Sequence, residues 1–279
     1  MFRLAYNSNG FRKKTIFDTL DCLSSLGYEA VEISLHRNHL DPFYHSDMYI
    51  ESLRRKVHDT GLTVANVHTG AKDLLSERDF EPSLISVNKK DRQRRIELIL
   101  KAAEVSKEIG CKYVTVTSGV LPATSTVEES HRILCDSLDE LVERNKTDTM
   151  LLIENEMNML VERAPAVLSL LDRYPRKLGV TYDIGHAECC HEDISAFIDR
   201  FGSALKHMHF EDIKNHVHHH LLPGEGDIDF KSVVGFLLNH TYTGYCSIEL
   251  YTYSDEPEKA AECSKKYFVD LKEKIACLA

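Results

Sequence analysis

Four ionisable side chains stand at the ends of short apolar segments in the second half of the chain. Asp183 ends the β-branched and aromatic run LGVTYD, and Glu154 ends LLIE. His209 and Glu249 occupy similar places in KHMHF and SIEL. Three carboxylates and one imidazole form an oxygen-rich donor set that suits Mn²⁺ or Mg²⁺, with Co²⁺ or Zn²⁺ as alternatives. We therefore predict that these four residues bind one divalent metal ion.

Strand-like and helix-like segments alternate along the whole chain and must position this set. Short apolar runs alternate with segments whose apolar residues recur at helical spacing. The expected strands span residues 4–7, 29–34, 62–68, 111–117, 150–154, 178–182, 204–210 and 245–250. The expected helices include residues 47–59, 91–109, 191–201, 229–239 and 256–276. Strict alternation predicts a parallel sheet, and eight β–α units predict a (β/α)₈ TIM barrel forming a single domain over residues 1–279.

Several residues mark where the expected helices begin and end. Thr126 and Glu129 have the spacing of a capping box, which predicts a helix start. Gly61 follows the expected helix 47–59 and predicts its end. Pro165 is typical of a first helical turn. These signals agree with the alternation of strands and helices.

The ends of other expected strands supply further candidates for the site. All eight strands of a TIM barrel bring their C-terminal ends to one mouth, so residues far apart in sequence meet there. Glu32 and His68 end two early strands and are candidates for substrate contacts. Glu156 lies two residues after Glu154 and so points to the same side of the strand. It is therefore a candidate for a substrate contact or a partner of the metal ligands. His207 lies deeper on its strand and is expected to be a packed core histidine.

Composition and charge exclude several classes of partner. The net charge of −10 argues against a nucleic-acid-binding protein, which normally presents a basic face. No segment approaches the roughly 20 apolar residues that span a membrane, and residues 1–6 do not resemble a signal peptide. Eight cysteines without a CxxC pair favour a reducing, cytoplasmic setting. The expected partner is therefore a small molecule.

The segments IENE, TYDIGH, KHMHFED, PGEGDIDF and SIELY resemble motifs of the xylose-isomerase-like TIM-barrel superfamily. That group includes ketose 3-epimerases, sugar-phosphate isomerases, inosose dehydratases and DNA-repair endonucleases. The resemblance implies the same metal site, with the two glutamates, Glu154 and Glu249, also exchanging a proton with the carbon beside the substrate carbonyl. It implies that His186 contacts a substrate oxygen, and it is compatible with homo-oligomers.

The resemblance also directs attention to the histidines in the loop after the expected strand 204–210. In related proteins a basic or polar residue of this loop reaches the substrate, which makes His220 a candidate substrate contact. The cluster also contains His216, His218 and His219. A second metal site is one interpretation of the cluster, but a solvated polar loop is the simpler one.

Removing a proton beside a carbonyl requires stabilisation of the enolate oxygen, which a metal ion provides as a Lewis acid. Delivering a proton to either face requires two bases on opposite sides of the planar intermediate. We therefore expect a sugar, sugar phosphate or polyol isomerase or epimerase that works through an enediolate. The ketose 3-epimerases usually carry a Glu and an Arg where this chain has Leu160 and Asn215, which weakens a free-ketose epimerase assignment.

Three other functions remain open from the sequence. A dehydratase of the inosose or dehydroshikimate type would use the same metal and bases, with a leaving hydroxyl β to the carbonyl. A DNA-repair endonuclease would need more histidine ligands and a basic groove, and Thr117-Ser118-Gly119 ends the fourth strand without a histidine. The third is a non-catalytic barrel that binds a protein partner.

Overall fold

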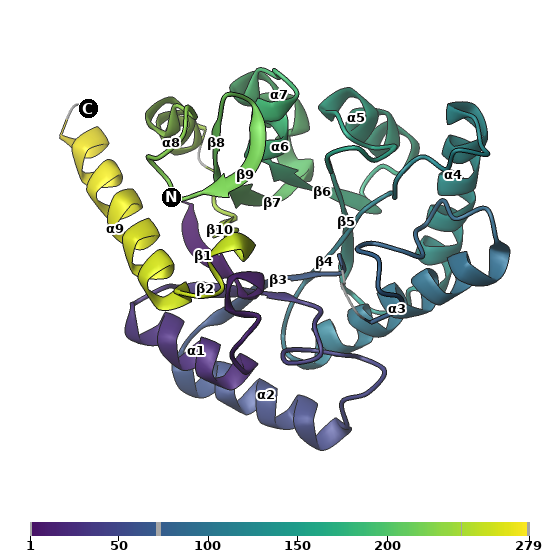
Figure 1. Ribbon diagram of the computed structural model, residues 1–279, viewed down its shortest axis with the longest axis horizontal. Helices are drawn as coiled ribbons and strands as arrows, with labels where there is room; N and C mark the ends of the chain where they lie inside the picture. Colours follow the sequence, from purple (N-terminus) through teal and green to yellow (C-terminus); the bar gives the residue numbers. More distant parts are fainter. Residues whose placement is uncertain (1, 71–73, 241, 278–279) are drawn as a thin grey trace.

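The computed structural model describes residues 2–70, 74–240 and 242–277, and Figure 1 shows helices arranged around a ring of strands. Within these residues, eight parallel strands close into a barrel in the order β1-β10-β7-β6-β5-β4-β3-β2. The predicted (β/α)₈ fold is therefore confirmed. The barrel strands are β1 (Arg3–Asn7), β2 (Ala30–Ser34), β3 (Thr63–His68), β4 (Tyr113–Val116), β5 (Met150–Glu154), β6 (Leu178–Asp183), β7 (Leu205–Phe210) and β10 (Tyr245–Ile248).

The helices begin and end largely where the sequence signals indicate. Thr126 and Glu129 form the predicted capping box, and Gly61 ends α2 with a φ of 71°. Pro165 lies in the first turn of α5. The outer helices are α1 (Ile16–Ser25), α2 (Asp47–Thr60), α3 (Lys89–Glu108), α4 (Val127–Arg144), α5 (Ala164–Arg173), α7 (Ile194–Phe201), α8 (Phe230–Asn239) and α9 (Pro257–Ala276).

The structure differs from the prediction directly after β6. Here a short helix, α6 (Ile184–Cys189), precedes α7, whereas the sequence predicts one helix over residues 191–201. Asp183 is the N-cap of α6, and its Oδ1 accepts a hydrogen bond of 2.9 Å from the backbone N–H of His186. The last residue of β6 therefore also starts the helix that carries His186.

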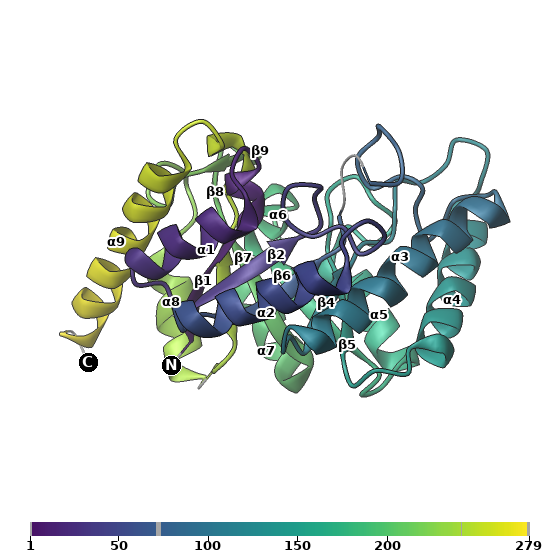
Figure 2. The same ribbon diagram turned by 90° about the horizontal axis from the view of Figure 1, so that it is seen from below.

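A second difference follows β7, where the sequence predicts a loop. The chain forms an antiparallel hairpin of β8 (Asp212–Lys214) and β9 (Val217–Leu221), which Figure 2 shows above the barrel strands. Asn215 and His216 both have positive φ, as a tight hairpin turn requires. Asp212 accepts hydrogen bonds from the backbone N–H groups of Gly224 and Gly226. The hairpin is therefore joined to the loop that precedes α8.

Polar side chains, rather than only apolar ones, fill the interior of the barrel below its mouth. Asn66 Nδ2 donates to Glu32 Oε1 at 2.8 Å and to Thr115 Oγ1 at 2.6 Å. Thr115 and Thr181 are also hydrogen-bonded to each other, at 2.6 Å. All four residues are fully buried. Their mutual hydrogen bonds offset the cost of burial and give the site a rigid base.

The helices surround the barrel rather than extend from it. Within the described residues, none combines the length and apolar character that crossing a membrane would require. Their buried faces pack against the outer faces of the strands, as Ile96, Ile99 and Ala103 of α3 illustrate. The main apolar core therefore lies between the barrel and the helices.

Candidate functional site

Glu154, Asp183, His209 and Glu249 meet at the C-terminal ends of β5, β6, β7 and β10. His209 Nδ1 lies 2.7 Å from Glu154 Oε1, 3.0 Å from Glu249 Oε2 and 3.5 Å from Asp183 Oδ2. The strand register produces this convergence, because Asp183 pairs with His209 across β6 and β7. All four side chains are buried. The structure thus brings together the four residues that the sequence indicates as metal ligands.

The unpaired atoms of this cluster fit a cation. Both His209 Nδ1 and Asp183 Oδ2 are fully buried, and among the described residues neither makes a hydrogen bond of good geometry, although carboxylate oxygens lie close to His209 Nδ1. A buried polar atom without a partner is costly, and several carboxylates at one point repel one another. A divalent ion among the four groups would remove both costs. The donor set of three carboxylates and one imidazole is typical of Mn²⁺ or Mg²⁺ and also accommodates Zn²⁺.

Glu32 lies behind this cluster and does not line the cavity at the mouth of the barrel. Its carboxylate contacts His209 Nε2 at 3.0 Å and His207 Nε2 at 2.8 Å, and its side chain is fully buried. Burial alone would raise the pKa of Glu32, but the two imidazoles hold it well below the usual value. The arrangement orients His209 so that Nδ1 faces the three carboxylates, as a carboxylate commonly does behind a metal-binding histidine.

Replacing Glu32 by Gln is expected to weaken Mn²⁺ binding by roughly 10- to 100-fold, because an amide orients His209 less strongly and does not increase its basicity. Isothermal titration of the metal-free protein with Mn²⁺ measures the change. Glu29→Gln is the matched control, since Glu29 is exposed and lies three residues earlier. Equal Mn²⁺ affinities for the two variants would show that Glu32 does not support the metal centre.

Side chains from two other elements position the carboxylates. Asn9, in the short helix η1 (Ser8–Phe11), donates from Nδ2 to Glu249 Oε1 at 2.6 Å. His68 Nε2 lies 2.7 Å from Glu154 Oε2. Burial alone would raise the pKa values of both glutamates, but nearby histidines lower each to about 2: chiefly His209 for Glu249, and His68 with His209 for Glu154. Both carboxylates are therefore ionised at neutral pH.

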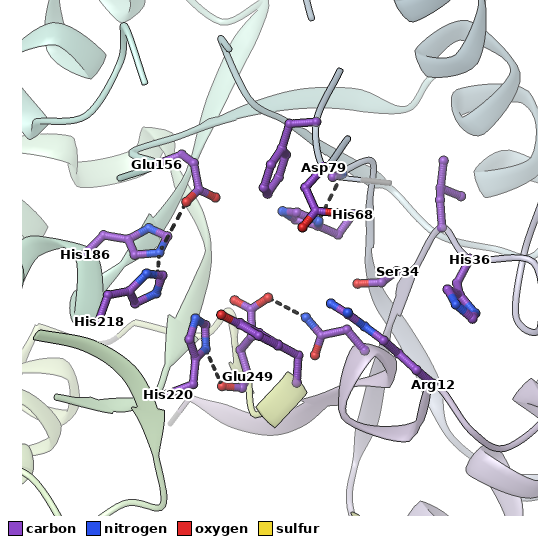
Figure 3. Close-up of a pocket in the computed structure, with 15 residues that line it drawn as sticks. Arg12, Ser34, His36, His68, Asp79, Glu156, His186, His218, His220 and Glu249 are labelled. Carbon is purple, nitrogen blue, oxygen red and sulfur yellow. Dashed lines mark hydrogen bonds and ion pairs between the residues drawn. The ribbon is translucent and has the colours of Figure 1, made fainter. Parts of the chain in front are cut away.

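A cavity of about 190 Å³ opens above the cluster, smaller than the roughly 300–1,000 Å³ of sites for drug-sized ligands. Figure 3 shows Glu156, His186, His218 and His220 along one side and Arg12 and His36 along the other. Of the residues predicted to contact substrate, these line it: His68, Glu156, His186 and His220. Glu249 also lines it, whereas Glu154, Asp183 and His209 do not. Burial raises the pKa of Glu156 to about 7.

The structure adds residues that the sequence interpretation does not assign to the site. Asn155 accepts a hydrogen bond from the backbone N–H of Asp183 and donates one to its carbonyl. Because Asn155 is adjacent to Glu154, strand alternation predicts that its side chain points away from the barrel interior, and the sequence pattern gives no signal that it is a site residue. Glu211 does have such a signal, because it continues the parity of His207 and His209. Asn9 and Arg12 follow β1 in a segment without a strand pattern.

Comparison with known proteins gives one family over most of the chain. Residues 20–270 match the family described as Xylose isomerase-like TIM barrel. An inosose dehydratase of Salmonella typhimurium (strain LT2) is 27% identical over 137 residues, which cover 42% of this chain and 46% of that protein. A fructoselysine 3-epimerase of Escherichia coli O157:H7 is 26% identical over 183 residues, covering 63% and 66%. The alignments thus span about half to two thirds of these curated relatives.

A solved structure extends the similarity of fold to the whole chain. The crystal structure of the IOLI protein with a bound zinc atom superposes with a TM-score of 0.80 and 18% identity. It covers 98% of this chain and 99% of that one. At this identity the superposition supports the fold, and the family match supports common descent. The chain belongs to the family of xylose isomerase-like TIM barrels.

Proposed function

We propose that the protein is a metal-dependent isomerase or epimerase that acts on a small sugar, sugar phosphate or polyol. The observation that carries this proposal is the pair of buried glutamates, Glu154 and Glu249, whose carboxylates lie 2.7 Å and 3.0 Å from His209 Nδ1. They come from strands β5 and β10, with β6 and β7 between them. Two carboxylates placed in this way could each serve one face of a planar enediolate.

A bound divalent ion would supply Lewis-acid stabilisation of the negative charge that develops on the substrate oxygens. Glu249 lines the cavity, so its carboxylate can accept a proton from a substrate carbon held there. Asn9 fixes that carboxylate by its hydrogen bond to Oε1. Glu154 lies just below the cavity, where it would be the second proton carrier. Mn²⁺ is the ion we propose first.

The walls of the cavity suit a substrate with several hydroxyl groups. His186 donates from Nδ1 to the carbonyl of Asn155 at 2.7 Å, which leaves its Nε2 directed toward Glu156 and His218. Histidine and carboxylate groups of this kind can donate to and accept from hydroxyls. We propose that His186, Glu156 and His68 contact the substrate oxygens, with His220 at the hairpin side.

A dehydratase is the second candidate, and the inosose dehydratases among the relatives favour it. The first step would be the same removal of a proton beside the carbonyl. A hydroxyl on the next carbon would then leave as water after it receives a proton. Glu156 lies in the cavity wall, where it could supply that proton. The two candidates therefore differ in the fate of the enediolate and not in how it forms.

Incubation in D₂O with Mn²⁺ and a panel of ketoses, ketose phosphates and inososes tests both candidates. Mass spectrometry of the recovered compounds is the measurement. Incorporation of one deuterium without a change of formula would support the isomerase or epimerase, and loss of water would support the dehydratase. Absence of both across the panel, with protein shown to contain metal, would contradict an enzyme of either kind on these substrate classes.

A further inference from the structure

One arginine stands at the wall of the cavity that lies opposite most of its histidines. Among the described residues that line the cavity, Arg12 is the one lysine or arginine. Figure 3 shows its guanidinium end directed toward the middle of the cavity, opposite Glu156 and His186. We propose that the substrate carries an anionic group, a phosphate monoester or a carboxylate, and that Arg12 binds it; this assignment rests on the proposed function.

The guanidinium of Arg12 has no polar partner within the described part of the chain. No carboxylate there forms an ion pair with it, and no oxygen accepts a hydrogen bond from it, although the side chain is partly buried. Arg54, Arg144 and Arg173, in contrast, each donate to a carboxylate. The buried Arg95 donates to two backbone carbonyls. Arg12 therefore keeps its full set of N–H donors for a molecule that enters the cavity.

Tyr251 holds the guanidinium in place without using these donors. The Cζ atom of Arg12 lies over the Tyr251 ring, 5.1 Å from its centroid. A cation above an aromatic face is attracted by the ring electrons, whereas the N–H groups of a guanidinium lie in its own plane. Tyr251 also lines the cavity and follows Glu249 by two residues. The stacked arginine can therefore still bind an anion in the cavity that Glu249 lines.

The backbone that carries Arg12 is fixed by two neighbouring side chains. Asn38 Nδ2 donates to the carbonyl of Arg12 at 2.9 Å, and His39 Nε2 lies 3.2 Å from the carbonyl of Phe11. Arg12 directly follows η1, in which Asn9 donates to a carboxylate of the metal cluster. One short element thus positions both the cavity arginine and a proposed proton carrier. A group on so constrained a backbone loses little freedom when a ligand binds.

The charges on the two walls favour one orientation of an anionic substrate. Arg12 would attract the charged end, and Glu156 on the opposite wall would repel it. The hydroxyl groups of the substrate would then face Glu156 and His186. A planar guanidinium matches the oxygens of a carboxylate or phosphate with two parallel hydrogen bonds, which a single neutral hydroxyl cannot provide. The cavity of about 190 Å³ restricts the ligand to a small molecule.

Binding of compounds that are not substrates tests the role of Arg12 without any turnover. Glycerol, glycerol 3-phosphate and glycerate contain no ketone or aldehyde, and isothermal titration of the protein in the presence of Mn²⁺ compares their affinities. At least one of the two anions should bind roughly 10- to 100-fold more tightly than glycerol, the usual contribution of hydrogen bonds to a charged group. Arg12→Ala should remove this preference. Arg12→Lys, which keeps the charge but not the planar fork, should restore part of it.

Lys13→Ala is the matched control, because Lys13 is the next residue and is exposed, with its ammonium group paired to Asp255. It removes the same charge and should keep the preference for the anion. Circular dichroism checks that Arg12→Ala folds, and Arg12→Gln, which is closer in length, replaces it if it does not. Equal affinities for glycerol and both anions, or a preference that persists without Arg12, would overturn the assignment. The tighter of the two anions distinguishes a phosphate from a carboxylate.

The reaction provides a second measurement. With an anionic substrate of the panel, Arg12→Ala should raise KM by roughly 10- to 100-fold with a smaller change in kcat, while kcat/KM for neutral ketoses stays the same. A preference for anions without turnover of any compound would contradict the proposed function and leave the anion contact standing. Turnover of a neutral ketose without a preference for anions would refute the contact alone.

Discussion

Glu249→Gln is expected to reduce deuterium exchange into the substrate by roughly 10²- to 10⁴-fold, the usual contribution of a general base. The amide has nearly the same shape as the carboxylate but cannot accept the proton. It would also remove one anionic ligand from the group around His209 Nδ1. Initial rates of exchange in D₂O, measured at saturating Mn²⁺ with the best substrate of the panel, provide the comparison.

The control separates loss of the base from a general effect of the substitution. Glu256→Gln makes the same change seven residues later, at an exposed side chain just before α9, and should leave the exchange rate unchanged. Metal content is measured on both variants, so that a slow Glu249→Gln protein with full metal identifies the loss as one of proton transfer. Exchange at the rate of the unaltered protein would contradict the assignment of Glu249.

Removal of the metal is expected to abolish exchange. Without a divalent ion, nothing in the cluster stabilises the charge on the substrate oxygens, and the carboxylates of Glu154, Asp183 and Glu249 are left close together. Dialysis against a chelator, followed by addition of Mn²⁺, should eliminate and then restore the exchange. Binding at 100 times the dissociation constant would also add about 2.7 kcal/mol to the free energy of unfolding. For a chain of this length, that raises the melting temperature by roughly 5 °C.

In Asp183→Asn, Mn²⁺ should restore less exchange and raise the melting temperature less than in the unaltered protein, because the variant has lost one charged ligand. Its asparagine side chain can still cap α6. Adding Ca²⁺ in place of Mn²⁺ compares the site's response to a larger ion. An unaltered rate after the metal content has been reduced to a trace would exclude a metal-dependent reaction.

The fold could be predicted from the sequence because its pattern is simple. Each strand is a short apolar run and each helix an amphipathic one, and Thr126, Gly61 and Pro165 mark helix ends by their own chemistry. The β8–β9 hairpin could not be predicted in this way. Its second strand reads VHHHL, without apolar alternation, and its pairing depends on a turn at Asn215 and His216.

The candidate site could be predicted in part. Position at the end of a barrel strand was enough to indicate Glu154, Asp183, His209 and Glu249, because the fold itself brings strand ends together. It was not enough to show which way each side chain points. Glu32 also ends a strand, yet its carboxylate is directed at His207 and His209 inside the barrel and not at the cavity. That difference depends on how interior side chains pack, which the sequence pattern does not record.

Asp183 has one further consequence, because its two oxygens have different tasks. Oδ1 caps α6, while Oδ2 faces the cluster around His209. The residue that would hold the ion thus also determines where the helix bearing Gly185 and His186 begins. Binding of an ion at the cluster and formation of the first turn of α6 are therefore thermodynamically linked through a single carboxyl group. An ion that binds more tightly when α6 is formed must stabilise α6 by the same free energy.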